Sequence, residues 1–312
     1  MPGQSSRTLT STRRAKTRVI DVLSVHTVTT LRAFIAMPLE LILLASVAAV
    51  LIGARPLARR HVEWRRERLR RRPVPPAWHT VLALRLPLFR RLPDDVRTRL
   101  LADMQVFLAE KRFYGQDGLE VTETMRLVIA AQACLLQLNQ PTRYFPDFTS
   151  IILYPDTYVS TETAHDGLLE STHEHVRAGE SWYRGPVILS WRDIADDLAH
   201  ARDGHNVVVH EFAHKLDEQD GLMDGAPALD NVQRRSWLTV FRHEYERLTH
   251  ALDRGERTWL DPYAASAPEE FFAVTVESFF AQGAALQQHH PELYRELAAF
   301  FGFDPASWRD AL

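Results

Sequence analysis

Cysteine is almost absent from this sequence, with Cys134 as the single example among 312 residues. A disulfide framework within the chain is therefore excluded, and the composition fits a reducing compartment. Cys134 stands in the apolar run LVIAAQACLLQLN at 127–139, which predicts a small buried side chain rather than a reactive thiol.

A strong net charge is also lacking, because 37 lysines and arginines nearly balance 40 aspartates and glutamates and leave a formal net charge of −3. The average conceals an uneven distribution, since arginines crowd the first 72 residues and acidic residues collect further on. The net charge therefore identifies no class of partner. With 46% hydrophobic and 25% charged residues, the composition is that of a globular protein of one large domain or two ordinary ones.

One long apolar run is present at 33–54, AFIAMPLELILLASVAAVLIGA. At about 1.5 Å per residue a helix of this length would cross a hydrocarbon core of about 30 Å, which predicts a transmembrane anchor. Pro38 and Glu40 weaken the prediction, because a carboxylate within the span costs roughly 2–3 kcal/mol unless it lies at the interface. A buried or interfacial helix and a cleaved signal peptide are the alternatives, and the arginines directly after the run argue against export.

Residues 55–76 predict a basic juxtamembrane segment followed by a proline-rich linker, PVPP at 73–76. Dense positive charge beside an apolar span is held on the cytoplasmic side, and it favours anionic lipid over nucleic acid as its partner. Residues 1–32 are rich in serine, threonine and arginine without clear helical periodicity, and Met37 follows them. They are interpreted as a disordered extension or as a segment before the true start of translation.

We expect residues 77–312 to form one folded domain of class α+β, mainly helical with a small sheet. Helix-period patterns are followed by short β-branched and aromatic segments bounded by proline, glycine and aspartate, and then by further helices. The expected helices cover 92–113, 122–138, 207–217 and 232–250, with a last one from about Ala267, and the expected strands lie within 149–160 and 185–191.

The motif VVVHEFAHKLD at 207–217 carries the clearest chemistry. On a helix, residues four apart lie one above the other, so His210 and His214 can direct their imidazoles at one ion while Glu211 stands beside them. This is the HExxH pattern of zinc sites, in which a carboxylate beside the metal takes the proton of the attacking water. The alternative is a surface helix with two solvated histidines, but the apolar neighbours indicate a buried helix.

A catalytic zinc site needs a third protein ligand and keeps a fourth position open. The segment DEQDGLMDG at 217–225 would have to swing back over its own helix and is typical of a polar turn, so the late helix is favoured. There Ser266 and Glu269 match a capping box, which leaves Glu270 free, and an inward carboxylate is costly unless it meets a metal. Glu277, two turns further on, either competes for this place or orients a histidine from behind.

Two further groups have alternative interpretations. Tyr263, seven residues before Glu270, either reaches the open side of the metal and stabilises a developing oxyanion or packs as an aromatic after a proline. His173 and His175 in THEHV would chelate a metal if the segment were a strand, but the glutamates around them favour a solvated loop.

Four segments carry a resemblance to a known family, namely RLVIAAQACLLQLN at 126–139, SWYRGPVILSW at 181–191, NVVVHEFAHKLD at 206–217 and DPYAASAPEEFFAVTVESFF at 261–280. The sequence resembles the Mlc titration factor A family of zinc-dependent metallopeptidases over most of residues 78–312. The resemblance implies that His210, His214 and Glu270 bind one Zn²⁺ ion. It also implies that Glu211 is the general base and that Tyr263 stabilises the oxyanion. The fold implied is that of the anthrax lethal factor catalytic domain.

The hypothesis that results is a zinc-dependent, aminopeptidase-like enzyme acting on a peptide or protein, with 185–191 as the edge strand that holds the substrate. The alternative is a weakly catalytic or non-catalytic regulator that sequesters a transcriptional repressor, since the best-known family member binds the repressor Mlc and affects sugar-uptake genes. No direct nucleic-acid binding is expected. The expected location is the cytoplasmic face of the bacterial inner membrane, or the cytoplasm if 33–54 is not an anchor.

Overall fold

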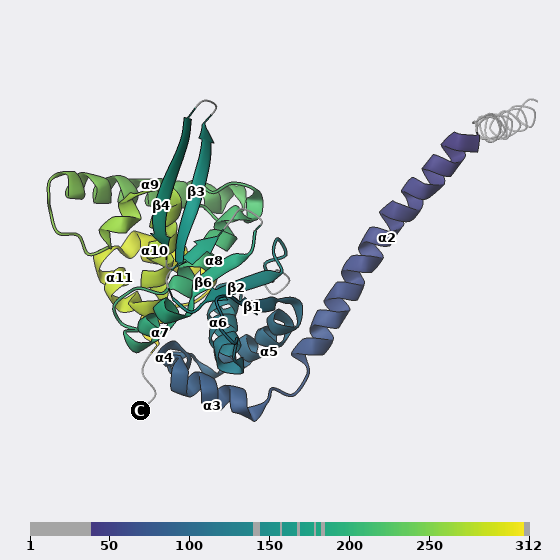
Figure 1. Cartoon of the computed structure of the whole chain (residues 1–312), viewed down its shortest axis with the longest axis horizontal. Coiled ribbons are helices and arrows are strands. Elements are labelled where there is room, and N and C mark those ends of the chain that lie inside the picture. Colours follow the sequence, from purple (N-terminus) through teal and green to yellow (C-terminus); the bar gives the residue numbers. More distant parts are fainter. Residues whose placement is uncertain are drawn as a thin grey trace, which may run out of the picture. The chain divides into compact units, whose positions relative to one another are not determined.

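The computed structural model describes residues 39–139, 144–156, 158–166, 169–177, 179–181 and 185–308, and the statements below concern these residues (Figure 1). For residues 39–42 and 45–55, and for the described residues between 158 and 181, it gives the course of the backbone alone. The predicted extension at 1–32 lies outside the described residues. The chain divides into two compact units, residues 1–65 and 66–312.

Helix α2 (Leu39–Arg70) begins in the first unit and contains Pro56 in its interior. The predicted membrane anchor, 33–54, falls on residues that are not described or are described by their backbone alone, apart from the exposed Leu43 and Leu44. Among helices built of described residues, none combines the length and the apolar character needed to cross a membrane. The anchor therefore stays a prediction.

The second unit is mainly helical, as the sequence predicted. Its α-helices are α3 (Pro76–Arg85), α4 (Pro87–Arg91), α5 (Asp94–Glu110), α6 (Glu123–Leu135), α7 (Trp191–Ala199), α8 (Val207–Asp217), α9 (Asn231–Asp253), α10 (Pro268–Ala281), α11 (Gly283–His289) and α12 (Pro291–Phe301). Short 3-10 turns are η1 (Glu218–Asp220), η2 (Pro262–Ala265) and η3 (Pro305–Ser307). The helices expected over 92–113, 122–138, 207–217 and 232–250 are α5, α6, α8 and α9, and the one expected from about Ala267 is α10. Helices α3, α4, α7, α11 and α12 were not predicted as separate helices.

A small sheet accompanies these helices, which agrees with the expected α+β class. Its strand order is β1 (Arg112–Gly115), β2 (Ser150–Tyr154), β6 (Val187–Ser190) and β5 (Gly179–Ser181). Strands β1, β2 and β6 run parallel, and β5 pairs with β6 in the antiparallel sense. The expectation that 185–191 offers a free edge to the substrate is wrong, because β6 has β2 on one side and β5 on the other.

A separate antiparallel hairpin is formed by β3 (Tyr158–Asp166) and β4 (Leu169–Arg177), and it projects from the rest of the unit in Figure 1. His173 and His175 therefore lie on a strand, and the preference for a loop at this place is wrong. Their side chains belong to the part that is described by its backbone alone.

The last turns of α2 belong to the second unit and are fixed to α5. Arg66 donates two hydrogen bonds to the carboxylate of Glu110, at 2.9 and 2.8 Å. Arg70 donates to Oδ1 of Asp103 at 2.7 Å, and the hydroxyl of Tyr144 donates to the same oxygen at 2.8 Å. Because Asp103 is buried and its partners are charged or polar, this junction holds the helix end in one position.

The motif helix α8 is set into the core by an aromatic residue. Phe212, between the two motif histidines, is fully buried. The centroid of its ring lies 5.9 Å from that of Phe107, 5.0 Å from that of Phe145 and 5.9 Å from that of Phe148. Burying a side chain of this size contributes roughly 1.5–3 kcal/mol. The contact fixes the rotation of α8, so the histidines face α10, the helix that packs most extensively against it. Cys134, on α6, is buried, which confirms the predicted small buried side chain, and burial raises the pKa of its thiol.

Candidate metal centre

Helix α8 begins at a polar cap. Asn206 has an extended backbone, and its side-chain oxygen accepts a hydrogen bond from the backbone N–H of Val209 at 3.0 Å. This bond satisfies one of the N–H groups that the first turn of a helix leaves unpaired. The helix then continues to Asp217 without interruption. His210 and His214 consequently lie one turn apart on the same side.

Helix α10 supplies the acidic residues of the site. It begins at Pro268, and its N-cap residue is Ala267, which offers no side-chain cap. The predicted capping box of Ser266 and Glu269 is therefore wrong. Ser266 instead closes the preceding 3-10 turn, where its hydroxyl donates to the carbonyl oxygen of Tyr263 at 2.6 Å. Proline in the first turn has no N–H to satisfy, so the helix can begin without the box.

Three ligand atoms converge between α8 and α10, and all lie within 4.8 Å of one another. The Nε2 atoms of His210 and His214 are 3.2 Å apart. Glu270 places one carboxylate oxygen 3.0 Å from Nε2 of His210 and the other 3.5 Å from Nε2 of His214. The three side chains are 14, 8 and 20% exposed, so the cluster is largely buried but still open to solvent on one side.

Glu277 contacts the opposite edge of the His210 ring. One of its carboxylate oxygens lies 2.7 Å from Nδ1 of His210, and the other accepts the backbone N–H of Asn206 at 2.5 Å. Because a carboxylate accepts, this contact requires a proton on Nδ1 of His210, so Nε2 is the nitrogen that would offer a lone pair to a metal ion. Glu277 was considered either as a competing third ligand or as a residue that orients a histidine, and its contact with Nδ1 of His210 agrees with the second role.

Charges within the cluster support one another. Burial lowers the pKa of His210, but the carboxylates of Glu277 and Glu270 outweigh it and hold that pKa well above its usual value. Burial raises the pKa of Glu270, and its contacts with the two imidazoles outweigh this and hold the pKa below its usual range. A divalent cation at the same place would act on the carboxylates in the same direction and would displace the imidazole proton that faces it.

Glu211 lies beside this cluster and is only 4% exposed. Its Oε2 atom and Nδ1 of His214 are buried and have no hydrogen-bond partner among the described residues. Leaving such an atom unpaired costs about 1–3 kcal/mol, so a buried orphan normally has a water molecule, ligand or ion as its partner. Burial also raises the pKa of Glu211, against the smaller effect of the two histidines. The nitrogen and oxygen donors and the orphaned atoms fit zinc with a nearby water molecule.

Tyr263 lies in η2, directly before α10, and its ring centroid is 6.2 Å from that of His210. Its backbone N–H donates to Oδ1 of Asp261 at 2.8 Å, which starts the 3-10 turn. The side chain is 55% exposed, so it is not a core aromatic. Its position leaves the interpretation as an active-site tyrosine open.

Asp217 is a residue of this region whose importance the sequence patterns missed. It is fully buried, and its two carboxylate oxygens accept the backbone N–H groups of Gly225 and Ala226, each at 2.9 Å. Gly225 has φ +76°, and a Cβ there would stand 2.5 Å from the carbonyl oxygen of Pro268. The end of α8 is thus joined to the start of α10 through this loop. The available signal was the position of Asp217, three residues after His214 and therefore on the same buried side.

The other acidic residues of the turn face a different partner. Arg234 of α9 donates to Asp220 at 3.0 Å and to Asp224 at 2.7 Å. Glu218 forms a buried ion pair with Lys215 at 2.9 Å. Each carboxylate after the motif is therefore engaged elsewhere, which agrees with the expectation that 217–225 does not bend back toward the histidines.

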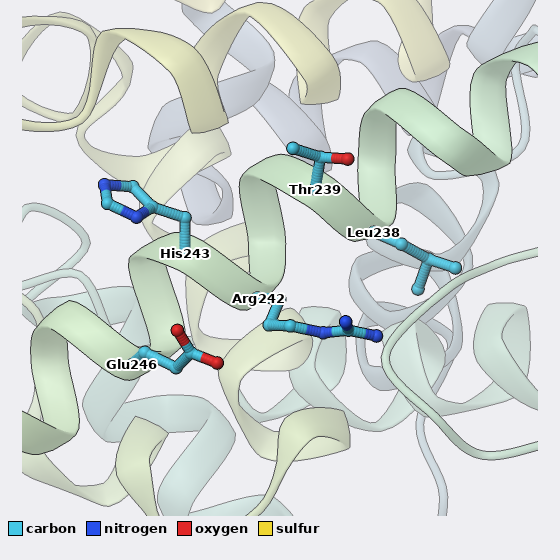
Figure 2. Close-up of a pocket in the computed structure, with 5 residues that line it drawn as sticks. All are labelled: Leu238, Thr239, Arg242, His243 and Glu246. Carbon is cyan, nitrogen blue, oxygen red and sulfur yellow. The ribbon is translucent and has the colours of Figure 1, made fainter.

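A separate hollow of about 270 Å³ lies along α9 (Figure 2). All of its lining residues come from this one helix, namely Leu238, Thr239, Arg242, His243 and Glu246. Figure 2 shows that their side chains spread apart along the helix instead of pointing to a common centre. Ligand sites need convergent polar groups, so this hollow is not the candidate reaction site.

Two histidines of an HExxH helix and a glutamate of a second helix are typical of a metal-dependent peptidase. Comparison with known proteins agrees with this class. Residues 61–302 match the family described as glucose-regulated metallo-peptidase M90. The chain accordingly belongs to this M90 family, which includes Mlc titration factor A, and the resemblance drawn from the sequence is confirmed.

Individual relatives cover most of the chain. An uncharacterized protein of Synechocystis is 43% identical over 249 residues, which are 78% of this chain and 90% of that protein. Mlc titration factor A of Yersinia pestis is 31% identical over 245 residues, 75% of this chain and 88% of its own length. The protein of the same name from Yersinia pseudotuberculosis gives the same figures.

Proposed function

We propose that the chain is a zinc-dependent peptidase whose ion is held by His210, His214 and Glu270. The observation that carries this proposal is the convergence of three ligand atoms within 4.8 Å. Imidazole and carboxylate suit zinc, and three protein ligands leave a position open for chemistry. When bound, zinc would supply Lewis-acid polarisation of the scissile carbonyl and would make water more acidic.

Glu211 is the proposed general base. Its orphaned Oε2 atom is buried beside the histidines and is therefore available to a water molecule in the site. The carboxylate would take a proton from the attacking water and then deliver it to the nitrogen of the leaving amine. The next residue, Phe212, packs its ring in the core against Phe145, so the proposed base and the core contact lie on different sides of α8.

Two residues would support this reaction from either side. Glu277 would hold the imidazole of His210 in the tautomer that leaves Nε2 free. Tyr263 would donate a hydrogen bond from its hydroxyl to the carbonyl oxygen as negative charge develops there. Tyr263→Phe should lower kcat by about 10²–10³-fold with unchanged zinc content. An unchanged kcat would remove Tyr263 from the mechanism.

The substrate backbone is proposed to pair with β5 (Gly179–Ser181). This strand has β6 on one side, contacts α8, and has no second strand partner among the described residues. Adding an extended peptide to such an edge is a common recognition mode. Membership of the family supports an aminopeptidase-type activity and a fold like that of the anthrax lethal factor catalytic domain. Hydrolysis of a peptide with a free amino terminus, but not of its acetylated form, would identify an exopeptidase.

Glu211→Gln tests the central assignment. The amide cannot take a proton, so turnover should fall by about 10²–10⁴-fold, while elemental analysis should still find one zinc per chain. Glu269→Gln is the matched control, because it also removes one carboxylate near the site but lies outside the cluster, and it should leave both quantities unchanged. Full activity of the Glu211 variant would refute the mechanism, and a wild-type protein that binds no zinc would refute the proposal as a whole.

A regulatory binding role is the second candidate, favoured by the 31% identity to proteins named Mlc titration factor A. In that role the chain would bind a transcriptional repressor, with catalysis weak or absent. A cellular phenotype that survives Glu211→Gln, together with undetectable hydrolysis, would select this alternative.

Attachment to the cytoplasmic face of the membrane depends on residues 33–54, and fractionation of the chain with and without them would test it.

A further inference from the structure

A cavity of about 400 Å³ lies at the opposite end of α8 from the turn 217–225. It is enclosed by residues from 86–91 around α4, from 197–206 between α7 and α8, and by the end of α10 at 280–281. In Figure 1, α4 and α7 lie side by side at this place. The volume is within the range of sites for small molecules, roughly 300–1,000 Å³. None of the three proposed zinc ligands lines it.

The lining of this cavity is rich in groups that bind anions. Its basic side chains are Arg90, Arg91, Arg202, His200 and His205, and its acidic ones are Asp197 and Asp203. Arg90 is exposed and makes no hydrogen bond or ion pair within the described part of the chain. Arg91 has one long hydrogen bond, to the carbonyl oxygen of Ala281 at 3.4 Å. Two guanidinium groups of the same short helix therefore retain most of their hydrogen-bonding capacity.

Asp197 does not satisfy these arginines, because it is engaged with the backbone. Its Oδ2 atom accepts the N–H of Val207, the first residue of α8, at 2.7 Å. Burial raises the pKa of this carboxyl to about 6, although the bond from Val207 acts in the opposite direction. The carboxylate of Asp197 thus caps α8, and the positive charge of the arginines is left for a molecule from solution.

The cavity is also connected to the metal cluster by a short chain of hydrogen bonds. Asn206 lines the cavity, and its backbone N–H donates to one oxygen of Glu277 at 2.5 Å. The other oxygen of Glu277 lies 2.7 Å from Nδ1 of His210. A shift of the segment 197–206 would therefore move Glu277 and change its contact with His210, a proposed zinc ligand. Such a route can carry a coupling free energy between two sites.

We propose that this cavity is an effector site for a small molecule that carries phosphate or carboxylate groups. The molecule would be held by Arg90 and Arg91, and its binding would alter zinc affinity through Asn206 and Glu277. Arginine suits both chemistries because its planar fork matches two oxygens at once. The binding step is independent of the proposed peptidase function, whereas the coupling step rests on the proposed zinc site.

Calorimetry at low ionic strength tests the binding step. The metal-free full-length chain is titrated with inorganic phosphate, with pyrophosphate and with citrate. We expect one saturable site for at least one of these anions with a dissociation constant below about 1 mM, and about tenfold weaker binding in Arg90→Gln. The matched control is Arg85→Gln, since Arg85 is an exposed arginine at the end of α3 that does not line the cavity. Phosphate-only or citrate-only binding would distinguish the two ligand chemistries.

Absence of saturable binding, or equal weakening in both variants, would overturn the proposal, because the second result indicates general attraction to surface charge. Zinc affinity is then measured in a chelator buffer, with the free ion read by a fluorescent dye, with and without the bound anion. We expect a change of about five- to hundredfold that disappears in Arg90→Gln. An anion that binds without this change would refute the effector role. A wild-type chain that binds the anion but no zinc would refute the peptidase proposal and leave the anion site standing.

Discussion

Two clusters in the second unit join histidine to glutamate, and only one of them contains an arginine. The metal cluster consists of His210, His214, Glu270 and Glu277, and the arginine cluster consists of Glu244, Arg247 and His290. In the arginine cluster, Oε2 of Glu244 lies 2.8 Å from Nδ1 of His290 and 2.5 Å from a guanidinium nitrogen of Arg247. The metal cluster has two carboxylates, yet neither has an arginine or lysine partner among the described ion pairs.

The difference shows how a structural cluster and a binding cluster can be told apart. A guanidinium of the chain itself already balances Glu244, so the arginine cluster needs nothing from solution. Burying two carboxylates without an arginine or lysine to balance their charge is costly unless another cation is added. A divalent ion between the converging atoms would supply that cation. The comparison therefore makes the zinc requirement of the metal cluster testable against an internal reference.

The largest expected effect is the removal of the third ligand. Glu270→Ala should weaken zinc binding by about a hundredfold or more, since even partners behind the ligands are worth about 10–100-fold. Competition with a chelator measures this change. Glu269→Ala, one residue away on α10, is the control and should bind zinc as the wild type does. Equal zinc affinity in the two variants would contradict the ligand assignment and remove the contrast between the clusters.

A smaller effect is expected behind the histidine. Glu277→Gln should weaken zinc binding by about 10–100-fold, because the amide carries no charge and no longer fixes the Nδ1 proton of His210 as strongly. The same change at Glu244 should leave zinc affinity untouched. If Glu277→Gln bound zinc normally, its carboxylate would be a structural group like Glu244, and the proposed asymmetry would be refuted.

Asp217→Asn tests whether the loop at the end of α8 contributes to the metal cluster. The amide keeps the shape but offers one acceptor oxygen to two N–H groups, so the variant should lose about 1–3 kcal/mol of stability. Zinc affinity should fall by about tenfold, because the start of α10 near Pro268 would be less firmly placed. Asp220→Asn, in the same turn, is the control. A loss of stability with unchanged zinc affinity would make Asp217 a folding residue only.

The parts of the metal cluster that lie close together in the sequence were predictable. His210, Glu211 and His214 follow from the period of a helix, and the helix was recognisable from its apolar neighbours. Glu270 was selected because an inward carboxylate is costly, and its position beside both Nε2 atoms agrees with that reasoning. The capping box failed because Ser266 is the C-cap residue of η2, and a 3-10 turn leaves little periodic signal.

The parts that depend on distant segments were not predictable. The edge position assigned to 185–191 was wrong because β5, a strand of three residues, pairs with β6. Such a strand is too short for propensity or alternation to reveal. The cavity behind α8 unites three segments that are more than a hundred residues apart at the extremes, and only the folded chain places them together.

Glu244→Gln is expected to have the smallest effect, and only on stability. Burial raises the pKa of Glu244, but the hydrogen bond from His290 and the charge of Arg247 outweigh it, so the folded-state pKa lies below the usual 4.5. A carboxyl with a depressed pKa contributes stability above its unfolded pKa, and this contribution is lost as the pH falls through the folded pKa. Near neutral pH the free energy of unfolding of the wild type should therefore exceed that of the variant by about 1 kcal/mol, a value limited by the half-exposed Arg247. The difference should vanish below the folded-state pKa. Urea denaturation of both proteins at a series of pH values from 7 downward measures this convergence. A change in zinc content on this substitution would show that the arginine cluster is not an isolated reference, and the distinction between the two clusters would then fail.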